Sequence, residues 1–66
     1  MITYRIKEEQ NRGILLATYY NGRYIGDSFG YWIGRDTLMT YPRKIYSMPP
    51  AGTELKRRVS LAEVIR

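Results

Sequence analysis

The sequence contains neither cysteine nor histidine. Without cysteine the chain can form no disulfide and no thiolate metal site. Without histidine it lacks the most common general base and metal ligand. No apolar run approaches the ~20 residues of a membrane-spanning helix, and no signal-peptide pattern is present, so we expect a cytoplasmic protein. With 66 residues, the chain must gain its stability from packed apolar side chains or from a partner, and a homodimer is one such solution.

Acidic residues are also scarce, since six Asp and Glu stand against eleven Lys and Arg, which gives a net charge of +5. The carboxylates show no spacing typical of a general acid–base pair. The glycines at 22, 26, 30 and 34 lack the strand–loop–helix context of a phosphate-binding loop. We therefore predict that the chain is not an enzyme and holds no cofactor or metal. The positive charge favours a nucleic acid as partner, DNA more than RNA, with an acidic protein surface as the alternative.

What the sequence does contain is a strong β-hairpin pattern. Asn21-Gly22 lies between two β-prone runs, and Asn-Gly suits a type I′ turn, which requires positive φ at both central residues. A two-residue turn fixes the register, so Tyr20 should face Arg23, Tyr19 should face Tyr24, and Thr18 should face Ile25.

This register divides the hairpin into an aliphatic face and a second face that carries Tyr19 and Tyr24. The aliphatic face is predicted to hold Ile14, Leu16, Thr18, Tyr20, Arg23, Ile25, Asp27 and Phe29. Asp27 fits poorly there unless a bulge lies next to Gly26.

Residues 2–7 alternate between apolar and polar side chains and predict a further strand. Two registers stay open for it, because one residue in the loop that follows would turn every side chain to the other face. We favour the register that places Ile2 on the aliphatic face, since it builds one core and sets Arg5 and Lys7 beside Tyr19.

The predicted fold is therefore α+β: a three-stranded antiparallel sheet, with strands at about 2–7, 14–20 and 23–29, and one or two short helices. Asp36 is a suitable cap for a short helix over 37–41, although Pro42 limits its length and a strand is the alternative. A small SH3-like β-barrel is the alternative architecture if residues 37–48 form strands. The single Trp, within residues 31–33, is expected in the core rather than at a partner surface.

The C-terminal part is expected to belong to one small domain, 1–66, in which residues 47–52 form a Pro/Gly linker to a basic segment, 53–66. That segment is either one helix from about Thr53, or an extended stretch followed by a short helix from Leu61. Ser60 and Glu63 match a capping box.

Aromatic and basic side chains on the second face are typical of nucleic-acid binding, because cations neutralise phosphates and tyrosines stack on bases. A solvated sheet face that stabilises cross-strand packing is the competing interpretation. The candidate binding residues are Arg5, Lys7, Tyr19, Arg23, Tyr24, Arg35, Arg43, Lys44, Lys56, Arg57 and Arg58.

Residues 2–46, with their hairpin and the short segment after Asp36, resemble the three-stranded-sheet DNA-binding domains of the AP2-like and tyrosine-recombinase arm-binding families. The family helix is long and free of proline, whereas Pro42 interrupts this one. The resemblance implies a sheet that enters the major groove of DNA. It also implies that Arg5, Lys7, Tyr19, Arg23 and Tyr24 face the DNA.

The sequence thus favours a small non-catalytic nucleic-acid-binding module, of the kind used as an accessory or regulatory protein by a phage or mobile element. The alternative is a small inhibitor or adaptor that docks on an acidic protein surface.

Overall fold

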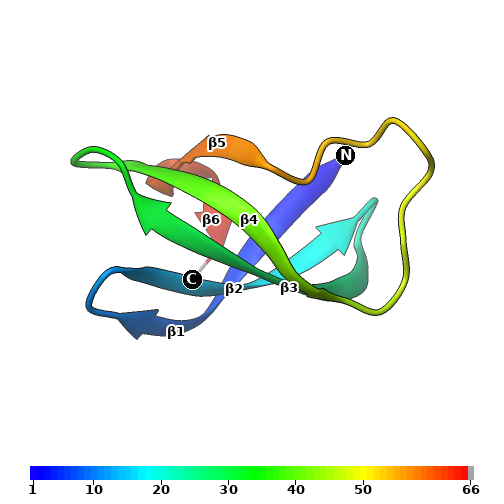
Figure 1. The fold of residues 1–66 in the computed structure, drawn as a ribbon, viewed down its shortest axis with the longest axis horizontal. Coiled ribbons are helices and arrows are strands. Elements are labelled where there is room, and N and C mark those ends of the chain that lie inside the picture. The colour runs from blue at the N-terminus through cyan, green and yellow to red at the C-terminus, as the bar shows by residue number, and fades with distance from the viewer. Residues whose placement is uncertain (66) are drawn as a thin grey trace.

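Short connections join the first four strands, and a longer segment, residues 46–56, leads to the fifth, so that these five strands form an antiparallel meander. The structure is a computed structural model that describes residues 1–65. The strands and the single short helix are β1 (Ile2–Gln10), β2 (Gly13–Tyr20), β3 (Arg23–Trp32), β4 (Thr37–Ile45), β5 (Arg57–Ser60), the 3₁₀ helix η1 (Leu61–Glu63) and β6 (Val64–Ile65). The six strands form one sheet in the order β5-β4-β3-β2-β1-β6, in which β6 runs parallel to β1 (Figure 1).

The sheet is curled into a half-barrel because of the way its two edge strands are joined. Only η1 separates β5 from β6, yet these strands lie at opposite edges. A flat sheet of six strands would be ~24 Å wide, whereas the few residues from Ser60 to Val64 reach ~14 Å at most. The short connection therefore requires the edges to approach each other, and β5 and β6 lie on the same side of the curled sheet (Figure 1).

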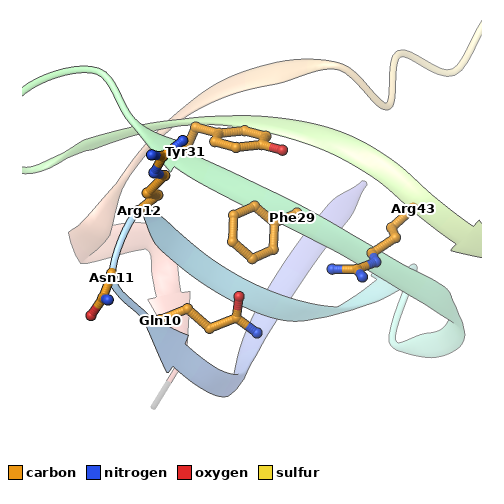
Figure 2. A pocket seen from close by; sticks show the side chains of 6 residues that line it. All are labelled: Gln10, Asn11, Arg12, Phe29, Tyr31 and Arg43. Carbon is orange, nitrogen blue, oxygen red and sulfur yellow. The ribbon is translucent and has the colours of Figure 1, made fainter.

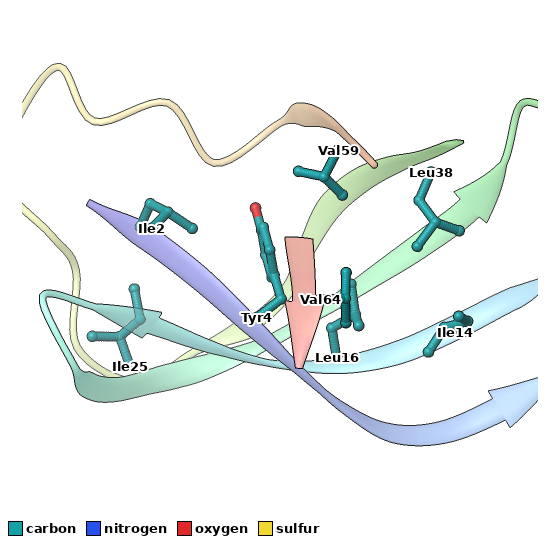
Figure 3. Close-up of a cluster of buried hydrophobic side chains, with 8 residues drawn as sticks. All are labelled: Ile2, Tyr4, Ile14, Leu16, Ile25, Leu38, Val59 and Val64. Atoms are coloured by element: carbon teal, nitrogen blue, oxygen red, sulfur yellow. The ribbon is translucent and has the colours of Figure 1, made fainter. Parts of the chain in front are cut away.

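The inner face of the half-barrel holds the hydrophobic core, as Figure 3 shows. The core consists of Ile2, Tyr4, Ile14, Leu16, Ile25, Leu38, Val59 and Val64. Two hydroxyl pairs lie buried among these side chains. Thr18 Oγ1 lies 2.7 Å from Ser28 Oγ, and Tyr4 Oη lies 3.1 Å from Thr40 Oγ1. Burial raises the pKa of the Tyr4 phenol, because the charged form would lose its hydration.

The predicted α+β fold is wrong, because six strands and one three-residue 3₁₀ helix replace the three strands and the short helices. Residues 37–41 belong to β4 and not to a helix. Pro42 is tolerated there because it lies beyond Thr37–Thr40, the residues that pair with β5, and beside an irregularity in the pairing with β3. The alternative architecture required strands within residues 37–48, and β4 lies there; over residues 1–65 the six strands form a half-barrel with β5 and β6 as its edges.

The predicted hairpin is confirmed. Asn21 and Gly22 both have positive φ, at 48° and 85°, and Tyr20 pairs with Arg23 and Tyr19 with Tyr24. The pairing of Thr18 with Ile25 is wrong, because a bulge makes Thr18 pair with Gly26. From that point on, β3 is shifted by one residue relative to the prediction.

The favoured register of the first strand is also confirmed. Ile2 pairs with Tyr20 and Ile6 with Leu16, which places the apolar residues of β1 over the core. Arg5 pairs with Ala17 on the opposite face. A second bulge, between Ile6 and Glu8, shifts the end of β1.

Of the two alternatives for the C-terminal part, the extended stretch followed by a short helix is correct. The capping box is present: the side chain of Ser60 accepts a hydrogen bond from the N–H of Ala62, and Glu63 accepts one from the N–H of Ser60 at 2.8 Å. The N–H of Leu61 donates to the carbonyl of Asp36 at 2.7 Å, which fixes η1 to the loop between β3 and β4.

Candidate functional site

The bulge at Gly26 decides which side chains of β3 lie on the outer face of the half-barrel. Gly26 has φ of +146°, and a Cβ there would lie 2.3 Å from the carbonyl oxygen of Lys44, so only glycine fits. After this bulge the alternation of the strand reverses. Asp27 and Phe29 point outward, whereas Ser28 takes an inner position opposite Leu16.

Two aromatic clusters occupy the outer face. The Tyr24 cluster lies near the Asn-Gly turn, and the ring centroid of Tyr24 is 5.8 Å from that of Tyr19 and 6.3 Å from that of Tyr46. The Tyr31 cluster lies near the other end of β3, with Tyr31 4.8 Å from Phe29 and 5.7 Å from Tyr41. Tyr24, Tyr31, Tyr41 and Tyr46 keep between 39% and 64% of their surface exposed, so each cluster offers ring surface to a ligand.

Cations surround both clusters. Lys44 Nζ lies 5.7 Å from the ring centre of Tyr46, and Lys56 Nζ lies 5.3 Å from that of Tyr41. Figure 2 shows a shallow cleft in which Arg12 and Arg43 lie on either side of Phe29. The cleft is lined by Gln10, Asn11, Arg12, Phe29, Tyr31 and Arg43.

Between the clusters, Asp27 is held by two outer-face neighbours. Lys7 Nζ lies 3.1 Å from Asp27 Oδ2, and the Tyr24 hydroxyl donates a 2.8 Å hydrogen bond to Asp27 Oδ1. This hydrogen bond to Asp27 raises the pKa of Tyr24 to about 12, because a tyrosinate would lose the bond and meet a like charge. Lys7 balances the carboxylate, so Asp27 adds little net negative charge to the face.

The structure brings most of the predicted binding residues to this one face and its margin. These are Arg5, Lys7, Tyr19, Tyr24, Arg43, Lys44, Lys56 and Arg58. Three predicted residues lie elsewhere. Arg23 lies beside the turn opposite Tyr20, Arg35 lies in the loop between β3 and β4, and Arg57 lies on the inner side, where its guanidinium donates to the carbonyl of Ile2 at 3.3 Å.

Sequence reasoning missed Arg12 and most of the two clusters. It placed Phe29 on the aliphatic face, whereas Phe29 lies on the outer face between Arg12 and Arg43, where it is 8% exposed. The pattern that could have found it is the poor fit of Asp27 on the aliphatic face, since a bulge at Gly26 turns both residues outward. Tyr41 was missed because the sequence left its segment open between a short helix and a strand.

The expected core position of residues 31–33 is also wrong. Tyr31, Trp32 and Ile33 are 47%, 37% and 49% exposed at the end of the β3–β4 hairpin. Ile33 and Met39 lie against Tyr31 and Tyr41 in a shallow apolar depression. The far end of the outer face is therefore more apolar than the sequence suggested.

The site is thus an aromatic and cationic sheet surface on an all-β half-barrel. Comparisons with protein-family models, curated proteins and solved structures gave no significant match. Among residues 1–65, no helix has the length and apolar character needed to cross a membrane. The same residues include no group of three acidic side chains placed to hold a metal ion.

Proposed function

We propose that this chain is a non-catalytic module that binds nucleic acid through the outer face of its sheet and acts in the cytoplasm, as an accessory or regulatory protein of a phage or mobile element. The observation that carries the proposal is the arrangement of cations around exposed aromatic rings on a single face. Cations neutralise phosphates, and rings supply surface for bases or sugars.

Charge supports the same proposal. The outer face and its margin gather Arg5, Lys7, Arg12, Arg43, Lys44, Lys56 and Arg58. Asp27 is compensated by Lys7, and Glu8 lies beside Arg43 and Lys44, so these cations outnumber the two carboxylates and the face as a whole is positive. A polyanion gains from such a face over its whole length, whereas a small anion would contact only a few of the cations.

The test is a titration of labelled DNA and RNA, each single-stranded and duplex, at two salt concentrations. If four of the cations contact phosphates, the affinity should fall about 50-fold for a single strand and about 150-fold for duplex DNA between 50 and 200 mM salt. Absence of binding to every one of these nucleic acids at the lower salt concentration would refute the proposal.

A pair of arginine variants tests the face rather than the net charge. Arg43→Ala and Arg35→Ala remove the same charge, but only Arg43 lies in the outer-face cleft. We expect Arg43→Ala to weaken binding and to make it less dependent on salt, and Arg35→Ala to leave both almost unchanged. Equal losses would show that overall charge, and not this face, attracts the nucleic acid.

An acidic protein surface is the second candidate partner, and the apolar depression formed by Tyr31, Ile33, Met39 and Tyr41 favours it. Exposed Tyr and Trp side chains are common anchors of protein interfaces. A pull-down that recovers one acidic protein, equally with and without nuclease, together with no direct binding to nucleic acid, would support this candidate instead.

A further inference from the structure

Resting on the proposed function, we propose that the outer face binds single-stranded nucleic acid, laid along β3 from the Tyr24 cluster to the Tyr31 cluster, and not a duplex. The width of the sheet is the first argument. The major groove of B-DNA is ~12 Å wide and admits a helix or a two-stranded ribbon. Here the outer face is built from β1 to β5, five neighbouring strands that span ~19 Å at ~4.8 Å per strand, before side chains are counted. The outer face therefore cannot enter the groove as a two- or three-stranded ribbon would.

The chemistry of the exposed side chains is the second argument. Tyr24, Tyr31, Tyr41 and Tyr46 offer ring surface, which stacks on bases only when those bases are not already stacked within a duplex. Duplex readout relies instead on amide and guanidinium groups that reach base edges. Around the Tyr31 cluster, the cations flank the rings: Arg12 and Arg43 line the cleft beside Phe29, and Lys56 lies over Tyr41. Such positions suit the backbone of a strand whose bases lie on the rings.

The spacing of the clusters is the third argument. Tyr24 and Tyr31 are seven residues apart on one strand, which corresponds to ~23 Å. A stacked strand with ~3.4 Å per nucleotide would cover this distance with about seven nucleotides. Arg43 and Lys44 lie between the clusters, beside Asp27, and provide the positive charge that the middle of the strand requires.

The experiment compares fluorescently labelled oligothymidylate, oligouridylate and a mixed-sequence blunt duplex DNA, all of about 12 nucleotides, at one low salt concentration. We expect at least one single strand to bind about tenfold more tightly than the duplex. In an added series of single strands of about 4 to 12 nucleotides, affinity should rise with length up to about seven nucleotides and then level off. The two single-stranded arms show whether the ligand is DNA or RNA.

Variants of Tyr31 separate stacking from charge. Tyr31→Leu should weaken single-strand binding about 5–150-fold, the range for loss of one stacked base, while duplex binding changes little. Tyr31→Phe keeps the ring and should bind nearly as the parent does. Because Tyr31 is 47% exposed, both variants should fold, and circular dichroism and thermal melting verify this.

The outcomes distinguish the two proposals. If no nucleic acid binds, the proposed function itself is wrong. If the duplex binds as tightly as the single strands, or if Tyr31→Leu binds single strands as the parent does while Arg43→Ala does not, the single-strand inference is overturned and nucleic-acid binding stands.

Discussion

The two faces of the sheet differ in how deeply their side chains are buried, although the same strands form both faces. The inner face is closed and packed: Leu16, Leu38 and Thr18 have no exposed surface. Within residues 1–65 no second layer covers the outer face, and most of its tyrosine rings remain partly in solvent. A half-barrel this small therefore buries one face for stability and leaves the other partly exposed to solvent.

The aromatic side chains illustrate the difference. Tyr4 lies on the inner face, 2% exposed, with its hydroxyl paired to Thr40. Tyr31 and Tyr46 lie on the outer face, 47% and 64% exposed. Residue type alone does not distinguish the core from the candidate site, because tyrosine occurs in both. The face of the strand on which a tyrosine lies decides whether it is buried.

The largest expected effect comes from the inner face. Leu38→Ala should lower the free energy of unfolding by about 2–5 kcal/mol, because it leaves a cavity at a fully buried position. A chain of this size has only ~3–10 kcal/mol in total, so this variant should be largely unfolded or close to it. Urea denaturation measures the loss. Tyr31→Ala, on the outer face, should lose less, about 1–3 kcal/mol, from its two ring contacts with Phe29 and Tyr41; equal losses would contradict the division between faces.

The second-largest effect is expected at Gly26, where the bulge decides which side chains of β3 lie on each face. Gly26→Ala should cost about 2–4 kcal/mol, because the new Cβ would combine an unfavourable φ with overlap of the Lys44 carbonyl. Gly52→Ala is the matched control, since Gly52 also has positive φ, +91°, but nothing lies within 4 Å of its Cβ position. That control should cost only about 1–2 kcal/mol. Thermal and urea denaturation compare the two, and equal costs would show that the close approach of the strands is unimportant.

A smaller effect is expected from the hydroxyl pair within the core. Thr18→Val or Ser28→Ala alone should cost about 1–3 kcal/mol, because each leaves a buried hydroxyl without its partner. The double variant should cost less than the sum, since no polar group is then left unpaired. A double-mutant cycle by urea denaturation measures this coupling. Additive losses would mean that the two hydroxyls do not interact.

The smallest effect concerns the exposed Tyr24–Asp27 pair on the outer face. The pKa of Tyr24 is raised from 10.0 to about 12, so the contribution of this pair to stability is fully present below about pH 10 and is lost as the pH rises through about 12. Asp27→Asn should bring the pKa of Tyr24 back towards its ordinary value. Nuclear magnetic resonance of ring-labelled tyrosine follows the titration. An unchanged pKa in the variant would show that Asp27 is not the cause.

Local patterns predicted much of the N-terminal half. The Asn21-Gly22 turn was predictable because its backbone requirement is met by few residue pairs. The alternation in β1 left two registers open, and the need for one core favoured the face that Ile2 occupies. The capping box at Ser60 was predictable for the same local reason, because its hydrogen bonds span only three residues.

The non-local features were not predictable in this way. Residues 37–45 join the sheet because β3 and β5 provide hydrogen-bonding partners on its two sides. No pattern within the segment itself predicts this pairing. Trp32 and Ile33 were expected in the core because of their composition, yet they lie at the exposed end of a hairpin. The position of Phe29 depended on the bulge at Gly26, and that of Tyr41 on the assignment of its segment to β4.

By itself, the sequence determined the positive charge, the turn and the inner face of the first two strands, because each follows from composition or from contacts between near neighbours along the chain. Only the tertiary structure decided the outer face. That face exists because Gly26 lets β3 approach β4 and shifts the alternation by one residue, and because the short η1 brings two distant edges together and curls the sheet. Both causes act between residues far apart in the chain, where local preferences carry no information.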